Sequence, residues 1–318
     1  MAYLDRVFEN VEEAVAIPNP LSFTGPVVIN GGGSITLNPN GNIYFVDANA
    51  SSGGDGSTWA KAFRTMAAAF AVLASGDTIF FRGKIREQLT TPVQVFDVTI
   101  VGAGNRPRHA DSTPAGGEIA ANSWTVPTSP AATTPCVKVL QQGWRFVNVL
   151  FYSHTDAASI LLYRDGGSGN AERDASHAEI LGCRFASGRD GVEQSGGCFN
   201  VKIDKCVFMA MSGYAIKHTA GAGIAAPLQW EITNNRFLRC ANWMGTWDAH
   251  NFKITGNEIL ETTTLLINTG GGTYNTIVGN TFSIAAADFD PTGNVTGDAT
   301  DVWSNTLIDS IETGLPAD

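Results

Sequence analysis

The stretch Ile180-Leu181-Gly182-Cys183-Arg184-Phe185 decides the fold, because its pattern recurs down the chain. Each copy has an apolar residue, two further residues, an asparagine or cysteine, one residue, and a second apolar residue. The copies begin at Ile180, Ile203, Ile232, Ile254, Ile277 and Val302, after a degenerate copy at Phe146. The shorter steps between successive starts are nearly equal, and the longer ones indicate insertions. A base period of about 23 residues with occasional insertions is typical of a solenoid coil.

The fourth position of the repeat forms a row down the solenoid: Cys183, Cys206, Asn235, Asn257, Asn280 and Asn305. We expect each row residue to stand at a sharp bend, where asparagine tolerates a left-handed backbone and satisfies main-chain groups. Its side chain is also placed to bond the same residue of the next coil, about 4.8 Å away. A disulfide between Cys183 and Cys206 is sterically conceivable, but five cysteines without a C-x-x-C pair favour reduced, buried thiols.

The composition excludes several classes of protein. With 43% hydrophobic and only 16% charged residues, the chain can bury a large core and is not disordered. Its 35 glycines indicate many tight turns. A net charge of −10 makes nucleic acid and anionic membranes poor partners. The sequence has neither a long apolar run nor a secretory signal peptide, and no clustered Cys/His spacing indicates a metal site.

The segment 1–75 differs in character from the repeats. Apolar residues at helical spacing predict a short helix over residues 1–15, followed by an extended, turn-rich arm with a short strand at 34–37. We expect residues 1–41 to form an anchoring or assembly segment. An Ala-rich helix is predicted near 65–75, within a solenoid that covers residues 42–310, and residues 311–318 form a tail.

Two resemblances extend this interpretation of the residues. The asparagine row, the three strands per coil and the entry segment resemble the right-handed parallel β-helix of the pectate-lyase-like superfamily; that segment includes 43–46, Trp59 and 76–83. The resemblance implies an all-β solenoid whose Ala-rich helix plugs the open end. A narrower resemblance, over 142–148 and 164–177, is to β-helix proteins of tailed bacteriophages, and it implies a structural protein of the virion.

A further strand follows each copy of the motif, at 191–193 and 215–217, and offers an outward face on which a catalytic site of such a β-helix would lie. Alternation places Val192 and Ile216 inward, and Glu193 and Lys217 outward in neighbouring coils, where a salt bridge is expected. The outward row then continues through one of Gly245, Thr246 and Trp247 to Ile267. This row is neither a set of calcium ligands nor a pair of carboxylates suited to glycoside hydrolysis.

The best acidic cluster lies elsewhere, in the loop 164–190. It contains Asp165, Glu172 and Asp174, together with Arg164, Arg173, Arg189 and Asp190. One interpretation is a sugar or metal site, because the glycines at 166–169 allow close backbone approach to a ligand. The other interpretation is a salt-bridged loop, which the mixed charges favour. If the protein is an enzyme, its expected catalytic residues are Asp165, Glu172, Asp174 and Glu193.

A second set of residues consists of candidates for glycan contact or for a subunit interface. They are Trp243, Trp247, Arg189 and Lys217. Tryptophan stacks on sugars and also anchors protein interfaces, and the interface is the preferred interpretation here.

Three hypotheses of function follow. The first is a non-catalytic structural protein of a bacteriophage virion, of spike, fibre or decoration type, made in the host cytoplasm. It would form a homotrimer without metal or cofactor, bind capsid or tail proteins through residues 1–40, and contact bacterial surface polysaccharide. The alternative is a polysaccharide depolymerase, a lyase or a glycoside hydrolase, and Ca²⁺ is expected only for a lyase. The third is a carbohydrate-binding module without turnover.

Overall fold

The computed structural model describes residues 27–29, 33–35, 41–51, 54–104, 122–165, 173–219, 226–245, 249–260, 267–268, 274–284, 295–296 and 302–309. For the strands at 27–29, 33–35, 267–268, 295–296 and 302–309, only the backbone is described. The predicted helix at 1–15, the tail at 311–318, Glu172 and Trp247 lie outside the described residues. Asn305 is described by its backbone alone.

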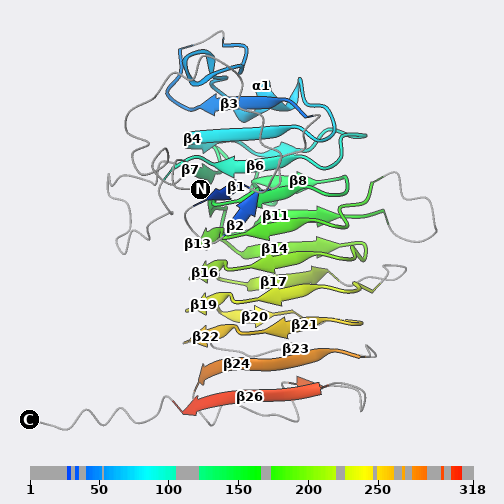
Figure 1. Cartoon of the computed structure of the whole chain (residues 1–318). Helices are drawn as coiled ribbons and strands as arrows, with labels where there is room; N and C mark the ends of the chain where they lie inside the picture. Colours follow the sequence, from blue (N-terminus) through cyan, green and yellow to red (C-terminus); the bar gives the residue numbers. More distant parts are fainter. Residues whose placement is uncertain are drawn as a thin grey trace, which may run out of the picture.

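The repeats form a solenoid with three parallel strands per coil, stacked from β3 (Ile43–Asp47) at one end to β26 (Val302–Asp309) at the other (Figure 1). The strand before each bend belongs to a series that contains β6 (Thr99–Gly102), β9 (Arg145–Val147), β12 (Glu179–Leu181), β15 (Lys202–Asp204), β18 (Glu231–Thr233) and β21 (Lys253–Thr255). We call it the first series. Each of its strands pairs in parallel with the strand one coil away.

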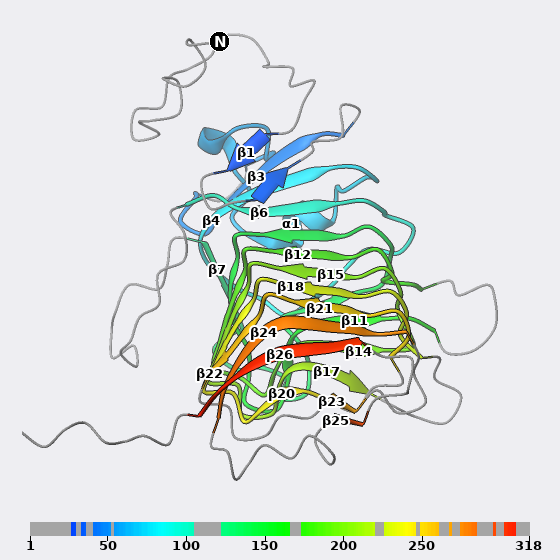
Figure 2. The same cartoon turned by 60° about the horizontal axis from the view of Figure 1, so that its bottom comes forward.

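The strand after each bend belongs to the second series: β7 (Asn122–Thr125), β10 (Leu150–Tyr152), β13 (Arg184–Ala186), β16 (Val207–Met209), β19 (Arg236–Leu238) and β22 (Glu258–Leu260). The long strands β4 (Thr78–Arg86), β24 (Thr276–Ile284) and β26 pass through both series. They join the two series into one sheet of 16 strands among the described residues. Viewed more nearly along its axis, the solenoid shows coils that superimpose (Figure 2).

The third strand of each coil forms a separate sheet of six strands in the described part of the chain: β5 (Leu89–Thr90), β8 (Val137–Val139), β11 (Ala158–Tyr163), β14 (Asp190–Ser195), β17 (Tyr214–Thr219) and β20 (Asn242–Met244). Two further strands, β23 (Ile267–Asn268) and β25 (Val295–Thr296), pair in parallel with each other. The predicted solenoid with three strands per coil is therefore confirmed.

The N-terminal part of the described chain carries the non-repeating elements. β1 (Val27–Ile29) and β2 (Gly33–Ile35) form an antiparallel hairpin that pairs with no other described strand, and β2 overlaps the strand predicted at 34–37. A 3-10 turn, η1 (Trp59–Lys61), precedes the helix α1 (Met66–Phe70), which is shorter than the predicted helix near 65–75. The side chain of Thr65 caps α1, and Phe70 packs against Trp124 and Trp144 in the core.

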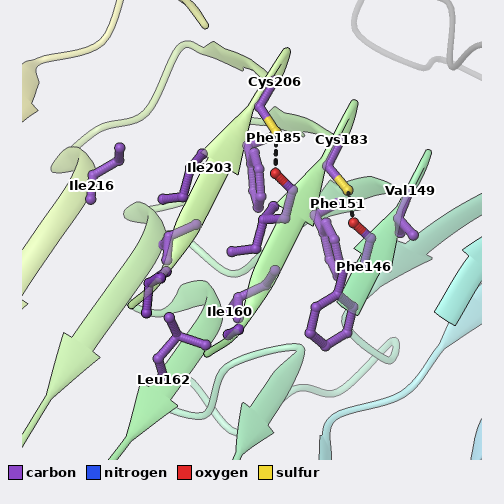
Figure 3. Packing of buried hydrophobic residues seen from close by; sticks show 14 of the residues in the cluster. Phe146, Val149, Phe151, Ile160, Leu162, Cys183, Phe185, Ile203, Cys206 and Ile216 are labelled. Carbon is purple, nitrogen blue, oxygen red and sulfur yellow. Dashed lines mark hydrogen bonds between the residues drawn. The ribbon is translucent and has the colours of Figure 1, made fainter. Parts of the chain in front are cut away.

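The apolar positions of the repeat build the core. Four successive copies, from the degenerate one at Phe146 to the one at Ile232, end in a phenylalanine. These rings form a stack of Phe151, Phe185, Phe208 and Phe237, whose centroids lie 5.3, 4.5 and 5.0 Å apart. Figure 3 shows rings of this stack beside the isoleucines of neighbouring strands. Offset aromatic pairs contribute about 0.5–1.5 kcal/mol each beyond the area they bury. The spacing of the motif therefore specifies both the coils and the side chains that pack in the core inside them.

The asparagine row is buried and hydrogen-bonded from coil to coil. Asn257 accepts from the backbone N–H of Asn235 (2.9 Å), and its Nδ2 donates to Asn280 (2.8 Å) and to the carbonyl of Ile232 (2.9 Å). Asn235 makes the equivalent bonds one coil earlier, accepting from Cys206 N–H and donating to Ile203. The predicted bond between row residues of successive coils is confirmed.

The predicted left-handed conformation at these asparagines is wrong. The left-handed residue is the one before each row position: Asn148, Gly182, Lys205, Asn234, Gly256 and Gly279, with φ between 55° and 67° in every case. The physical reason is that two neighbouring residues have different roles at the bend. The preceding residue turns the chain, so the row residue is free to point its amide along the solenoid and satisfy backbone groups that the bend would leave buried and unpaired.

The cysteines of the row replace asparagine as donors. All five cysteines are free and buried, as predicted. The thiols of Cys183 and Cys206 donate to the carbonyls of Phe146 and Ile180, each at 3.3 Å (Figure 3). Burial raises the pKa of Cys240 to about 11, and it raises the pKa of Cys206 well above the usual range, so both thiols stay protonated at neutral pH.

Replacing Cys206 with asparagine tests the row directly. The new amide has the carbonyl of Ile180 as a ready acceptor, and a neutral hydrogen bond contributes about 1 kcal/mol. We expect Cys206→Asn to match or exceed the wild-type free energy of unfolding in urea. Cys240→Asn is the matched control: Cys240 is equally buried but lies outside the row, and its thiol is 3.7 Å from the carbonyl of Leu238, in its own coil. That variant should lose about 2 kcal/mol; equal losses in both variants would contradict the assignment.

A second left-handed row runs along the corner where the third strand of one coil turns into the first strand of the next. It contains His177, Asn200, Gln229, Asn251 and Tyr274, with φ between 52° and 64°. These five residues, which we call the left-handed corner, lie three positions before the isoleucine of each motif and are all exposed. Asp97 and Gly143 extend the same row toward the N-terminal end. A shorter row with the same backbone, Ser187, Ala210 and Arg239, follows the second strands.

Candidate functional site

The predicted orientation of the third strands is confirmed. Val192 and Ile216 are fully buried, while Glu193 and Lys217 point outward in register on β14 and β17. Lys217 Nζ lies 3.7 Å from a carboxylate oxygen of Glu193, which is the expected salt bridge. In the next coil Ile216 pairs with Met244, so the outward position after it is Gly245. The side chain of Ile267 lies outside the described residues.

Asp190 and Arg189 extend this pair to a network of four charged residues, which the sequence did not predict. The Asp190 carboxylate is only 1% exposed and receives Arg189 Nε at 2.6 Å and Lys217 Nζ at 3.5 Å. It also accepts from the backbone N–H of Tyr214 at 2.8 Å. Arg189 reaches on to Glu193 at 3.1 Å, and Glu193 accepts from Thr219 Oγ1. Two acids and two bases therefore neutralise one another on this face.

The electrostatics agree with that geometry. Partial burial disfavours the charge on Arg189, but the hydrogen bond and charge of Asp190 outweigh it and raise the Arg189 pKa above its usual value. Arg189 thus remains a cation held between two carboxylates. This arrangement fixes the positions of the side chains. Both carboxylates are bound by Arg189 or Lys217 within the network.

The acidic loop does not form the single cluster expected from the sequence. Asp174 lies at the other end of the strand, where its carboxylate pairs with Arg164 at 3.6 Å and accepts from Gln142 and Ser176. Because Arg164 follows the last residue of β11 and Asp190 begins β14, six residue steps along the paired strands separate the two groups by ~20 Å. Asp165 and Arg173 join at the base of the loop through a backbone bond of 3.0 Å.

The expected role of Trp243 at a glycan or subunit interface is wrong. Trp243 is fully buried, with its ring 5.7 Å from Phe237 and 5.3 Å from Phe282. It lies in register with Ala215, which is also fully buried. Near this bend both Trp243 and Met244 turn inward, so strict alternation does not hold there. Trp247, the other tryptophan of that prediction, lies outside the described residues.

Two further findings concern metals and membranes. Among the described residues, no three His, Cys, Asp or Glu side chains are grouped so that they could hold a metal ion. No helix in the described part of the chain is long and apolar enough to cross a membrane.

The left-handed corner is the surface feature that sequence reasoning missed. The signal that could have found it is positional: a polar or aromatic residue recurs three places before each motif isoleucine. The residues just before the corner row add Phe199, Leu228 and His250, which are linked by backbone bridges from coil to coil. His177 also packs edge-on against Phe199, with ring centroids 5.0 Å apart.

Comparison with known proteins identifies the fold. No protein-family model matches the chain, and no curated protein matches its sequence. Among solved structures, pectate lyase Pel9A is 14% identical, with a TM-score of 0.51 over 87% of this chain and 81% of that one. A pectin methylesterase from Aspergillus niger is 15% identical, with a TM-score of 0.43 over 89% and 90% of the two chains.

A phage protein is also among the similar structures. The Dettilon tailspike protein is 12% identical, with a TM-score of 0.36 over 74% of this chain and 54% of that one. At these identities the likeness concerns the fold alone. With its parallel sheets and three strands per coil, this chain is a parallel β-helix of the kind that pectate lyase Pel9A also forms.

Proposed function

We propose that this chain is a non-catalytic structural protein of a bacteriophage particle, of spike, fibre or decoration type, that assembles as a trimer. The observation that carries the proposal is the neutralised network on the third strands. Asp190 and Glu193 are the paired carboxylates of that face, and both are held by Arg189 and Lys217. A glycosidase instead needs one free acid and one free base or nucleophile across its substrate.

Other support comes from the sequence. The stretches 142–148 and 164–177 resemble β-helix proteins of tailed phages. The resemblance also supports a virion location and anchoring to capsid or tail proteins through residues 1–40. Surface polysaccharide of the bacterial host is the proposed additional partner.

The alternative is a polysaccharide depolymerase on the same fold. The observation that favours it is the closeness of Asp190 and Glu193 on the outer side of β14, bridged by one guanidinium group. A lyase would also require Ca²⁺, which takes six to eight oxygen ligands.

Light scattering on the full chain and on a chain without residues 1–40 tests the proposal. We expect a trimer of about three times the 33.6 kDa chain mass for the full protein. The shortened protein should keep this state, because within the described part of the chain the β1–β2 hairpin pairs with no strand of the solenoid. A monomeric full chain would contradict the trimer. Release of oligosaccharides from bacterial polysaccharide by the wild type, but not by Glu193→Gln, would establish the depolymerase instead.

A further inference from the structure

The left-handed corner exposes an unusual mixture of side chains. Tyr274 is 65% exposed, and beside the row Leu228 is 40% and Phe96 is 38% exposed. Three of the six large hydrophobic side chains that are exposed in the described part of the chain therefore lie along this one edge. Between them stand the amides of Asn200, Gln229 and Asn251. Apolar and aromatic surface combined with a few placed hydrogen-bonding groups is typical of ligand sites.

The backbone at this corner favours glycine, yet the chain rarely uses it there. A left-handed conformation is costly for histidine, glutamine and tyrosine, whereas glycine adopts it freely. At the bends the chain does use glycine, at positions 182, 256 and 279, all with positive φ. At the corner Gly143 is the one glycine among the described residues of the row. Large polar side chains kept in a strained conformation point to a role for the side chains themselves.

The charges beside the corner cancel. Arg164 stacks over the ring of Phe199 at 5.4 Å and pairs with Asp174. The nearest outward row on the first strand series alternates in sign and pairs within itself, as in Arg145–Glu179 at 3.1 Å and Glu231–Lys253 at 4.0 Å. A ligand that lies along this edge therefore contacts hydrogen-bonding groups and apolar surface, but no excess of positive or negative charge.

We propose that the left-handed corner binds an extended, neutral polysaccharide that lies parallel to the solenoid axis. The rungs are ~4.8 Å apart, close to the length of one pyranose unit in an extended glycan. Five rungs therefore offer about 19 Å of repeating contacts. Amides would bond sugar hydroxyls, and the ring of Tyr274 with the side chain of Leu228 would contact the C–H faces of the sugars. The inference rests on the proposed function only for the expectation that a glycan is a partner.

Retardation in native gels that contain dextran, galactomannan or alginate tests the inference on the full chain. The test variant is Gln229→Gly with Tyr274→Gly, and the matched control is Ser187→Gly with Arg239→Gly at the other left-handed row. Glycine suits the backbone at all four positions, so both variants should melt at or above the wild-type temperature. Loss of binding in the test variant then reports the side chains rather than unfolding.

We expect dextran or galactomannan to retard the wild type and the control, and the apparent Kd of the test variant to rise at least tenfold. Three outcomes would overturn the inference: unchanged binding by the test variant, an equal loss in the control, or retardation by the anionic alginate alone. None of these outcomes bears on the mass measured by light scattering or on depolymerase activity. Failure of the binding site and failure of the proposed structural role are therefore distinguishable.

Discussion

Replacing Asn257 with alanine should lower the free energy of unfolding by about 3 kcal/mol, because the central link of the asparagine row is lost. The amide is 1% exposed and bonds to Asn235, Asn280 and Ile232. Its removal leaves the N–H of Asn235 and the carbonyl of Ile232 buried without this partner. Each such group costs about 1–3 kcal/mol when it stays unsatisfied. Equilibrium unfolding in urea measures the loss.

Two further variants make this prediction sharper. Asn257→Cys should lose less than Asn257→Ala, because thiols at positions 183 and 206 already donate to the equivalent carbonyls. Asn251→Gly removes an exposed asparagine from the same coil, at a φ of 55° that glycine adopts freely. It should therefore change the stability by less than about 0.5 kcal/mol. If alanine and cysteine at 257 proved equivalent, the hydrogen bonds of the row would not be what stabilises the bends.

Replacing Asp190 with alanine should cost about 3 kcal/mol of stability. The carboxylate is buried, and its loss leaves Arg189 and Lys217 facing a single acid, Glu193. The backbone N–H of Tyr214 also loses its acceptor. Breaking a fully buried ion pair costs about 3–5 kcal/mol, and the lower value applies because Arg189 and Lys217 are 36% and 25% exposed.

The control for Asp190 is Asp156, whose side chain is 62% exposed. Asp156→Ala should change the unfolding free energy by no more than about 0.5 kcal/mol. The pair of variants also separates the two candidate functions. A structural role predicts that Asp190→Ala lowers stability in urea. Full retention of stability together with loss of a polysaccharide-cleaving activity would instead assign Asp190 to catalysis and overturn the non-catalytic proposal.

The residues that the sequence placed correctly are those governed by spacing within one coil. Ile180 and Phe185 face inward because they flank a bend at a fixed distance, and the same offset recurs in every copy. Glu193 and Lys217 face outward because strands alternate. The row bonds of Asn235 and Asn257 follow from the stacking of equivalent positions ~4.8 Å apart. None of these inferences depends on contacts between the loops of different coils.

The errors concern residues whose surroundings come from several coils. Asp174 and Asp190 are near each other in sequence, but β12 and β13 lie between them, and the two carboxylates end near opposite ends of β11 and β14. Trp243 was expected at a surface because tryptophan stacks on sugars and anchors interfaces. Its burial depends on Phe237 and Phe282 from other strands. At each bend the left-handed residue is the one before the row asparagine or cysteine, not the row residue itself. Only the three-dimensional geometry of the bend decides which of these two neighbours adopts that conformation.

By itself the sequence therefore determined the solenoid, the number of strands per coil, the inward positions and the hydrogen-bonded row, because each depends on a short period repeated along the chain. Only the tertiary structure decided which charges meet, that Asp190 completes the network of Arg189, Glu193 and Lys217, and that His177 to Tyr274 share one exposed edge. The physical reason is that insertions of different length change the sequence distance between coils, while the backbone bonds between strands hold the spatial distance constant.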